Sequence, residues 1–517
     1  MPTQNQEIQY NQPEHINGFL LEDEVKKDQF DYVNFFDPKN KKSDINAKLK
    51  VYAQVLIESI PLVFSMVLFP IITAYTYHTM KGIIKEVETV SLGLAINYQV
   101  IFGLFPGLGI GEMVGIYGSK AYGQSNEKKF WGYFYMGMFN FLLIFCLFSF
   151  PFLYFGETIL KLLQIGTEEA EIAGSLLRMF TGPTFIVIFN EVIKAGLISQ
   201  GIETPFLYIN LTAFITSVAT LNLCSYYGVT LNAVIINTYV LSLTQTILYL
   251  SSFIWLGKFK HHLVFKKDLL LKFTIECISM VLNFVFEIVS FHALTMIVGW
   301  TYDDAQISSY LFNSSFIDIF YCSNIAISFG YRTRINYTRG KQKPEIADNF
   351  SKFFIKSHII LGLLISLILI TLSPKIATFF TEDRTIRIYT SNLLKIFCIG
   401  FVCDCLQPII ETTIRSFRFS KSLGTFQFCV YGLFTGVLCW YVGIYKNVGV
   451  YGIISGFVLG RWIGFLSTII FAWSLSWEKL IREDSQRKSV LQMQNNLNPE
   501  FKEVENKNLD KKLIENN

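Results

Sequence analysis

The chain has 517 residues, of which 51% are hydrophobic, 16% are aromatic and only 16% are charged, and its mean hydropathy is +0.39. Soluble domains carry about 25% charged residues, so this composition excludes an ordinary water-soluble protein and favours many helices buried in lipid. The formal net charge of +4 does not indicate nucleic-acid binding, because the Lys and Arg residues gather in the tails and between the apolar runs.

The two ends of the chain are polar. Residues 1–48 finish in a basic run, and residues 477–517 are rich in Asn, Lys and Glu. Such segments bury too little apolar surface to fold alone, so both are predicted to be disordered tails. The first residues also lack the apolar core of a signal peptide, so the first spanning helix is expected to direct membrane insertion.

Twelve apolar segments lie between the tails. A spanning helix needs about 20 mainly apolar residues. The predicted segments are 50–77, 88–117, 129–154, 169–199, 205–227, 231–256, 267–299, 304–332, 347–373, 385–415, 422–445 and 449–475. The sequence therefore predicts an all-α integral membrane protein with about 12 transmembrane helices.

The basic residues between these segments predict how the chain is oriented. One alternating set of loops holds fifteen Lys and Arg residues, among them Arg332, Arg334 and Arg339, and the opposite set holds seven. Cytoplasmic loops carry the excess of positive charge, so the first set is predicted to be cytoplasmic. An even number of spans then places both termini in the cytoplasm, with the protein in the plasma membrane or a vacuolar-type membrane.

Short sequence matches recur between the two halves of the chain at nearly one offset. The matching pairs are LLRMF at 176–180 with LLKIF at 393–397, Tyr122-Gly123 with Arg339-Gly340, and Gly228-Val229 with Gly449-Val450. Two repeats of six spans have the same orientation, as in transporters built from parallel repeats. We therefore predict an N-terminal lobe at 49–260 and a C-terminal lobe at 261–476.

Three segments carry a family resemblance: the glycine-rich GLGIGEMVGIYGSKAYGQSN at 107–126, LISQGIETP at 197–205 and VGVYGIISG at 448–456. In their order and spacing the chain resembles the eukaryotic branch of the multidrug and toxic compound extrusion (MATE) family, with Lys120 where Gln is usual. The resemblance implies two lobes in a V around a central cavity, and export of organic cations in exchange for H⁺ or Na⁺.

The candidate coupling residues of the seventh span are Glu287 and His292. An ionisable side chain inside a span usually faces the bundle interior. Burial disfavours the ionised carboxylate, which allows proton exchange near neutral pH. The resemblance aligns Glu287 with an acidic family position. His292 stands where relatives have a second Glu, and an imidazole also titrates near neutrality. Both residues could instead be structural, hydrogen-bonded groups.

Further candidates lie in the eighth and tenth spans. Asp404 matches an acidic position of animal family members, and Glu411, seven residues on, shares its helical face. Glu411 also precedes Arg415 by four residues, which favours a local ion pair. In the eighth span, Asn313 aligns near a family acid, and Asp318 could replace that acid.

The N-terminal half offers fewer candidates. The family's acid in the second span aligns with Gly115, and Glu112 lies one turn earlier as a possible cavity-lining substitute. Glu191 precedes Lys194 by three residues, which predicts a structural ion pair. Two other glutamates lie near span ends and are predicted to be interfacial, namely Glu58 and Glu276.

The sequence thus predicts a secondary antiporter that exports organic cations, xenobiotics or metabolites in exchange for protons by alternating access. Sodium coupling is less favoured because the first span lacks the Asp that bacterial family members often carry, reading LFPIITAYTYHTM at 68–80. A lipid-linked precursor flippase is disfavoured because the mid-span charges are mostly acidic. A receptor or scaffold fits poorly with a parallel repeat. No phosphate-binding P-loop or CxxC pair occurs. We expect a monomer that is not an enzyme, with no metal or cofactor and no nucleic-acid partner.

Overall fold

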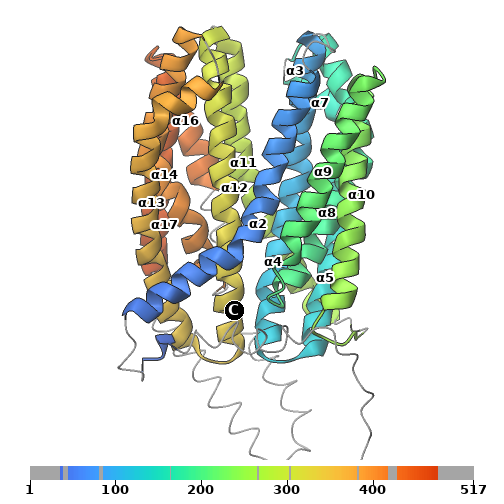
Figure 1. Cartoon of the computed structure of the whole chain (residues 1–517), viewed down its shortest axis with the longest axis vertical. Helices are drawn as coiled ribbons and strands as arrows, with labels where there is room; N and C mark the ends of the chain where they lie inside the picture. Colours follow the sequence, from blue (N-terminus) through green and yellow to red (C-terminus); the bar gives the residue numbers. More distant parts are fainter. Residues whose placement is uncertain are drawn as a thin grey trace, which may run out of the picture.

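The computed structural model describes residues 35–38, 45–80, 86–163, 165–262, 264, 267–301, 304–380, 383–416 and 428–474. Predictions for most of the two tails therefore lie outside the described residues. Figure 1 shows two bundles of helices standing side by side, with α2 running obliquely between them.

The bundle on the right in Figure 1 (blue to green) comes from the N-terminal half of the chain, and the bundle on the left (yellow to red) comes from the C-terminal half. The helices of the first half are α2 (Ile45–Met80), α3 (Glu86–Gln99), η2 (Val100–Leu104), α4 (Phe105–Gly123), α5 (Glu127–Ile144), η3 (Phe145–Ser149), α6 (Phe150–Tyr154), α7 (Gly156–Leu162), α8 (Thr167–Ile198), α9 (Pro205–Tyr226) and α10 (Leu231–Leu256). Those of the second half are α11 (Lys267–Thr301), α12 (Asp304–Gly340), α13 (Pro344–Phe380), α14 (Arg384–Ser416), η4 (Phe428–Phe434), α16 (Thr435–Cys439), η5 (Trp440–Tyr445) and α17 (Val450–Ser474).

Ten segments of the described chain are long and apolar enough to cross a bilayer. Two further helical stretches, the more polar α12 and the run from η4 to η5, bring the number to the twelve expected. The all-α membrane fold is therefore confirmed. Consecutive pieces such as α3, η2 and α4 form one continuous span, because the π-helical residues keep helical backbone angles.

The predicted end of the eighth span is wrong, and the error changes the environment of three arginines. The eighth span was expected to end at residue 332, with the following basic residues in a loop, but α12 continues to Gly340. Arg332, Arg334 and Arg339 therefore lie inside a helix, and they are 1%, 1% and 7% exposed. The helix continues because its polar residues recur at helical spacing and find partners in the interior.

Helix α2 contacts both bundles. Near its start, the Tyr52 hydroxyl hydrogen-bonds with Nδ1 of His358 on α13, at 2.9 Å. Toward its end, the Tyr75 hydroxyl donates to Oδ1 of Asn222 on α9, at 3.0 Å. The first turns of α2 thus pack on the C-terminal bundle, whereas the predicted N-terminal lobe begins at residue 49. The lobe boundaries remain a prediction.

Backbone conformation repeats between the two halves. Ser125 follows α4 and Gln342 follows α12, and both have left-handed backbones, with φ of 51° and 58°. Gly228 follows α9 and Gly449 precedes α17, and their φ angles are 70° and 77°. Glycine adopts such angles without steric penalty. Both pairs match at the offset of the sequence repeat, so the same turns recur in the two halves.

The two halves touch at a pair of equivalent glycines. A Cβ atom added to Gly123 would lie closer than 3.0 Å to the carbonyl oxygen of Tyr337, and one added to Gly340 equally close to that of Lys120. The repeat relates Gly123 to Gly340 and Lys120 to Tyr337, so the contact is reciprocal. The ends of α4 and α12 therefore cross where only glycine fits.

This crossing generates a stability prediction. Gly123→Ala should lower the free energy of unfolding by about 1–3 kcal/mol, because the new methyl group meets rigid backbone and overpacks the crossing. The control is Gly436→Ala on α16, where an added Cβ meets nothing within 4 Å. That change should be neutral or stabilise by up to about 1 kcal/mol. Denaturant unfolding of purified protein measures both, and equal effects would contradict the proposed crossing.

Candidate functional site

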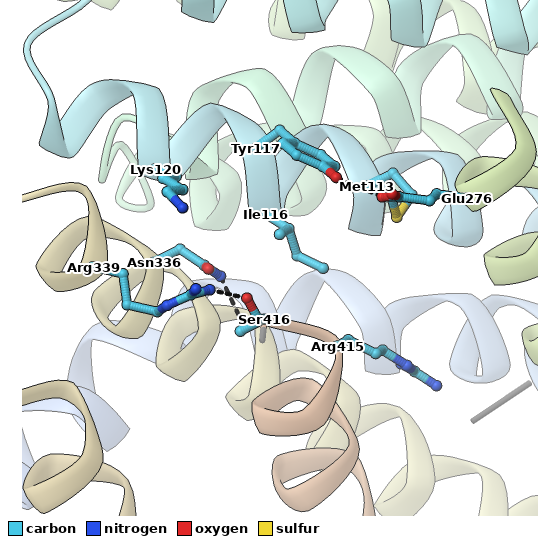
Figure 2. A pocket seen from close by; sticks show the side chains of 9 residues that line it. All are labelled: Met113, Ile116, Tyr117, Lys120, Glu276, Asn336, Arg339, Arg415 and Ser416. Atoms are coloured by element: carbon cyan, nitrogen blue, oxygen red, sulfur yellow. Dashed lines mark hydrogen bonds between the residues drawn. The ribbon is translucent and has the colours of Figure 1, made fainter. Parts of the chain in front are cut away.

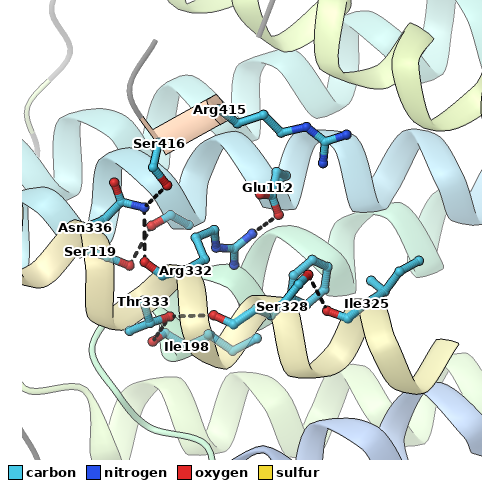
Figure 3. Close-up of polar contacts among 12 residues, drawn as sticks. Glu112, Ser119, Ile198, Ile325, Ser328, Arg332, Thr333, Asn336, Arg415 and Ser416 are labelled. Carbon is cyan, nitrogen blue, oxygen red and sulfur yellow. Dashed lines mark hydrogen bonds and ion pairs between the residues drawn. The ribbon is translucent and has the colours of Figure 1, made fainter. Parts of the chain in front are cut away.

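The interface between the bundles contains buried ion pairs near the ends of α4 and α12. Arg332 Nη1 of α12 donates to Glu112 Oε2 of α4, and the two side chains are 1% and 0% exposed (Figure 3). The Arg332 guanidinium also lies 4.6 Å from the ring centroid of Phe329. Glu112 was predicted as a possible cavity-lining residue, and in the structure it is the counter-ion of Arg332.

A missing side chain makes room for this arginine. A Cβ atom on Gly115 would lie closer than 3.0 Å to the guanidinium of Arg332. The position that the resemblance aligned with a family acid is therefore filled by a cation from the other half of the chain. Glu112, one turn earlier on α4, supplies the negative charge that this cation requires when it is removed from water.

Arg334 makes a second set of pairs. Its Nη2 donates to Glu58 on α2, its Nη1 donates to the carbonyl of Gly330 at 2.6 Å, and Nη1 also lies 3.6 Å from Glu203 Oε1. Glu58 was predicted to be interfacial, but it pairs with a buried arginine. Two residues of α12 thus hold carboxylates from α2, α4 and the turn between α8 and α9.

Glu203 lies in that turn, at residues 199–204, and its side chain is 4% exposed. Burial raises the pKa of Glu203 to about 8, and the nearby charges of Arg332 and Lys258 oppose this rise. Below about pH 8 the Glu203 carboxyl is therefore protonated. Arg334 then depends on Glu58 for its counter-charge.

A small pocket lies beside these pairs, at the same end of the interface (Figure 2). Its volume is about 20 Å³. It is lined by Met113, Ile116, Tyr117, Lys120, Glu276, Asn336, Arg339, Arg415 and Ser416. These residues come from α4, α11, α12 and α14, so the pocket is formed by both halves of the chain.

The polar side chains of the pocket are partly bonded to one another. The Tyr117 hydroxyl donates to Glu276 Oε2 at 2.5 Å. Arg339 donates to the carbonyl of Ser416, and Asn336 Nδ2 donates to the Ser416 hydroxyl at 2.9 Å. Glu276, predicted to be interfacial, is therefore half-buried beside the pocket.

Asp404, a predicted coupling residue, has a counter-ion that the sequence analysis did not identify. Asp404 Oδ1 lies 3.4 Å from Arg461 Nε, with side chains 5% and 7% exposed. The Arg461 guanidinium also lies 5.0 Å from the ring centroid of Phe457. The pair joins α14 to α17 inside the C-terminal bundle, so the charge of Asp404 is already balanced.

Two predicted local ion pairs are confirmed. Glu411 accepts from Arg415 at 2.9 Å, and it also accepts from Gln407 at 2.6 Å. Lys194 Nζ lies 2.5 Å from Glu191 Oε1, with both side chains buried. These carboxylates are neutralised within their own helices.

Asp318 is half-buried in α12, and it makes no hydrogen bond or ion pair with the part of the chain that the structure describes. Cys322, one turn along α12, lies within electrostatic range of both Asp318 and Lys194. Asn313, also predicted to line the cavity, is buried and donates to the carbonyls of Ser309 (2.9 Å) and Thr390 (3.2 Å). Asn313 thus links α12 to α14 by a hydrogen bond, whereas the Asp318 carboxylate makes no polar contact with the described residues.

Glu287 and His292 lie within α11, but their side chains lie outside the described residues, so their roles remain predictions. Among the described residues, no group of three or more His, Cys, Asp or Glu side chains could hold a metal ion.

Some of the charged site residues whose roles the sequence analysis did not recognise have local signals in the sequence. Arg461 stands alone in the apolar run of α17, where any ionisable residue marks a buried polar contact. Arg332 and Arg339 flank Asn336 at spacings of four and three residues, which places all three on one helical face. Glu203 had no local signal, because only the tertiary structure buries the turn that holds it.

The family model MatE matches residues 61–222 and 279–441. The chain belongs to this family. One matched stretch lies in each half of the chain, in agreement with the repeat. MATE proteins are multidrug and toxic compound efflux transporters, so the chain is a multi-pass membrane transporter and not an enzyme.

Individual MATE proteins show the same relationship. Protein DETOXIFICATION 35 of Arabidopsis thaliana is 23% identical over 422 residues, which is 78% of this chain and 84% of that protein. The probable multidrug resistance protein NorM of Halalkalibacterium halodurans is 26% identical over 179 residues, 34% of this chain and 38% of that protein. The crystal structure of the eukaryotic MATE transporter AtDTX14 superposes with a TM-score of 0.76 at 14% identity, covering 85% of this chain and 98% of that one.

The Glu112–Arg332 pair allows a direct test. Glu112→Gln should leave a buried guanidinium without its counter-charge and lower the free energy of unfolding by about 3–5 kcal/mol. Adding Arg332→Gln should recover at least half of that loss, because the unpaired cation is removed as well. Denaturant titration measures both variants. Glu157, whose side chain is 27% exposed and pairs with the 37% exposed Lys161, provides the control Glu157→Gln, which should leave stability nearly unchanged. Strictly additive single losses would contradict a cross-bundle pair.

Glu203 predicts a pH dependence of stability. Its folded pKa of about 8 exceeds its ordinary value of 4.5, so the folded protein holds a proton that the unfolded chain releases. The free energy of unfolding should therefore fall as pH rises from about 4.5 to about 8, by up to about 1.4 kcal/mol per pH unit. Glu203→Gln should remove this slope from unfolding curves in nanodiscs. An identical slope in wild type and variant would refute the assignment to Glu203.

Proposed function

We propose that this transporter exports small organic compounds, organic cations first among them, in exchange for protons by alternating access of its two bundles. The observation that carries the proposal is the pair of carboxylates, Glu112 and Glu58, that balance the buried Arg332 and Arg334. Each carboxylate can accept a proton, and each proton changes how strongly the bundles attract one another.

An ion pair removed from water is stable only while both charges are present, since a single buried charge is strongly unfavourable. Protonation of Glu112 would cancel its attraction for Arg332 and leave the guanidinium buried without a partner. That guanidinium regains water when α4 and α12 separate. Proton uptake therefore favours opening of this end of the interface.

We place the end of the molecule that carries this interface at the cytoplasm, because basic residues flank the ends of α4 and α12 there, namely Lys120, Lys128, Lys129, Lys341 and Lys343, and cytoplasmic flanks carry the excess of positive charge. Both termini would then be cytoplasmic, in a plasma or vacuolar-type membrane. The moving units would be the lobes at 49–260 and 261–476 of a monomer, with α2 as the helix that contacts both.

For the substrate, Asp318 is the best described candidate. An unpaired carboxylate inside a span attracts either a proton or a cation, and the two compete. Asp404 is a weaker candidate, because Arg461 already balances its charge. Glu287 and His292 remain candidates on α11. In that scheme a proton entering from outside displaces the substrate cation, which then leaves on the outer side.

Two alternatives to proton-coupled export are sodium-coupled export and flipping of a lipid-linked precursor. Sodium coupling is disfavoured because residues 68–80 of the first span, where bacterial relatives often carry an Asp, contain no acid. The flippase hypothesis was set aside on the argument that mid-span charges are mostly acidic, but several basic residues are also buried, namely Lys194, Arg332, Arg334, Arg339, Arg415 and Arg461. Most of these cations have carboxylate partners. They therefore do not supply the net positive cavity that a pyrophosphate would require.

The test is uptake of a fluorescent organic cation into proteoliposomes under an imposed pH gradient. Wild type should accumulate the cation, and Asp318→Asn should lose about tenfold or more in rate, as expected for one buried charged contact. Asp348→Asn is the matched control, because Asp348 bonds to Lys352 on α13 away from the interface. It should transport at close to the wild-type rate.

Two results would overturn parts of this proposal. Unchanged transport by Asp318→Asn would remove Asp318 from the mechanism and leave Glu287→Gln as the next variant in the same assay. Accumulation driven by a sodium gradient, with no response to pH, would replace the coupling ion.

A further inference from the structure

The segment that follows α10, residues 257–262, leads toward α11 and lies against the N-terminal bundle. Its backbone is bonded to that bundle at two points. The Lys258 N–H donates to Oε1 of Gln200 at 2.8 Å, and the indole N–H of Trp131 donates to the Lys260 carbonyl at 2.7 Å. Gln200 lies in the turn after α8 and Trp131 lies on α5, so this connecting segment is docked on two separate elements of one bundle.

Side chains of the connecting segment add to the docking. His262 Nε2 lies 2.9 Å from Oε2 of Glu127, in the first turn of α5. The Phe259 ring lies 5.4 Å from the ring of Phe130 on α5 and 5.1 Å from that of Tyr122, near the end of α4. The connecting segment therefore joins α4, α5 and the turn after α8, and it places an aromatic ring against Tyr122.

Through Tyr122 this docking reaches the other bundle. The ring of Tyr122 lies 5.9 Å from that of Tyr337 on α12, with the ring planes at 43°. A lysine ammonium lies near each ring: Lys258 is 5.5 Å from the Tyr122 centroid, and Lys341 is 5.5 Å from the Tyr337 centroid. Cations at this distance are attracted to the face of an aromatic ring. This tyrosine pair, Tyr122 with Tyr337, thus joins the two bundles.

The tyrosine pair lies at the glycine crossing. Gly123 directly follows Tyr122, and a Cβ atom on Gly123 would lie closer than 3.0 Å to the carbonyl oxygen of Tyr337. The two rings therefore lie beside the point where α4 and α12 meet backbone to backbone. An aromatic pair contributes beyond the area that it buries only while its rings stay within about 7 Å. The contribution of this pair thus depends on how firmly the last turn of α4 is held.

We propose that the tyrosine pair holds the interface closed at this end, and that the connecting segment positions Tyr122 for its contact with Tyr337. Phe259 is the positioning residue, since its ring contacts Tyr122 from within the N-terminal bundle. The inference rests on the alternating access of the proposed function, but it requires neither a particular coupling ion nor a particular substrate. It assigns the balance between the closed and separated arrangements partly to a contact that carries no net charge.

The experiment measures the distance between spin labels at Lys128 and Glu345, which are exposed on the two bundles at this end, in the full chain in nanodiscs at neutral pH. The exposed Cys146 and Cys429 are first replaced by Ser. Phe259→Ala should raise the ratio of the longer to the shorter distance by about two- to tenfold, the effect of losing one aromatic pair. Phe259→Tyr keeps the ring and should show the wild-type ratio.

The matched control is Phe152→Ala. Phe152 is also half-buried and contacts two rings, those of Phe102 at 4.4 Å and Phe148 at 5.1 Å. It lies at the end of its span opposite to Glu127, away from the crossing. Both alanine variants should lower the unfolding temperature, because each loses buried ring contacts. Only Phe259→Ala should change the distance ratio, and equal changes in both variants would overturn the positioning role.

A double-mutant cycle tests whether Phe259 acts through Tyr122. Tyr122→Ala should raise the distance ratio at least as much as Phe259→Ala does. Adding Phe259→Ala to Tyr122→Ala should then change the ratio by less than about twofold, because the ring that Phe259 positions is gone. Effects that multiply in the double variant would refute the assignment.

The same distances separate failure of this inference from failure of the proposed function. An unchanged ratio in Phe259→Ala, with two distances present in wild type, would overturn the positioning role alone. A single distance in wild type and in every variant would contradict alternating access as well.

Discussion

The structure depends on one electrostatic requirement: two arginines on a single helix are buried where no water can solvate them. Arg332 and Arg334 are each 1% exposed, and their counter-charges come from Glu112 on α4 and Glu58 on α2. Removing either partner from a buried pair is far more costly than the pair itself is stabilising. The close packing of α12 around these arginines is therefore stable only while Glu112 and Glu58 remain ionised.

The glycine crossing explains why this requirement falls at one end of the molecule. Gly123 and Gly340 let the ends of α4 and α12 meet backbone to backbone, and Gly115 leaves the space that the Arg332 guanidinium fills. Small residues at helix interfaces permit such close approach in membrane proteins. The sequence repeat makes the two glycine contacts equivalent. When the bundles are closed, the backbones of α4 and α12 are therefore in direct contact at the crossing, and the ion pairs lie nearby.

Much of this architecture could be predicted from the sequence, because apolar run length and repeated motifs are local signals. The helix number, the parallel repeat and the pairs Glu411–Arg415 and Glu191–Lys194 all follow from spacing along the chain. The cross-bundle pairs could not be predicted this way. Glu112 and Arg332 belong to different halves, and hydropathy assigned the residues after Arg332 to a loop because a paired cation and a solvated one look alike in sequence. Asp404 was identified as an acid, but its balance by Arg461 appears only in three dimensions.

The central claim is that protonation of the cross-bundle carboxylates opens the end of the interface where α4 and α12 meet. The most direct measurement is the distance between spin labels at Lys128 and Glu345, both exposed at that end, after the exposed Cys146 and Cys429 are replaced by Ser. The account predicts that a longer distance gains population as pH falls, because protonation removes the negative charge that balances Arg332. It also predicts that Glu112→Gln, which carries no charge at that position, shows the longer distance at every pH. A distance distribution that ignores both pH and this substitution would contradict the account.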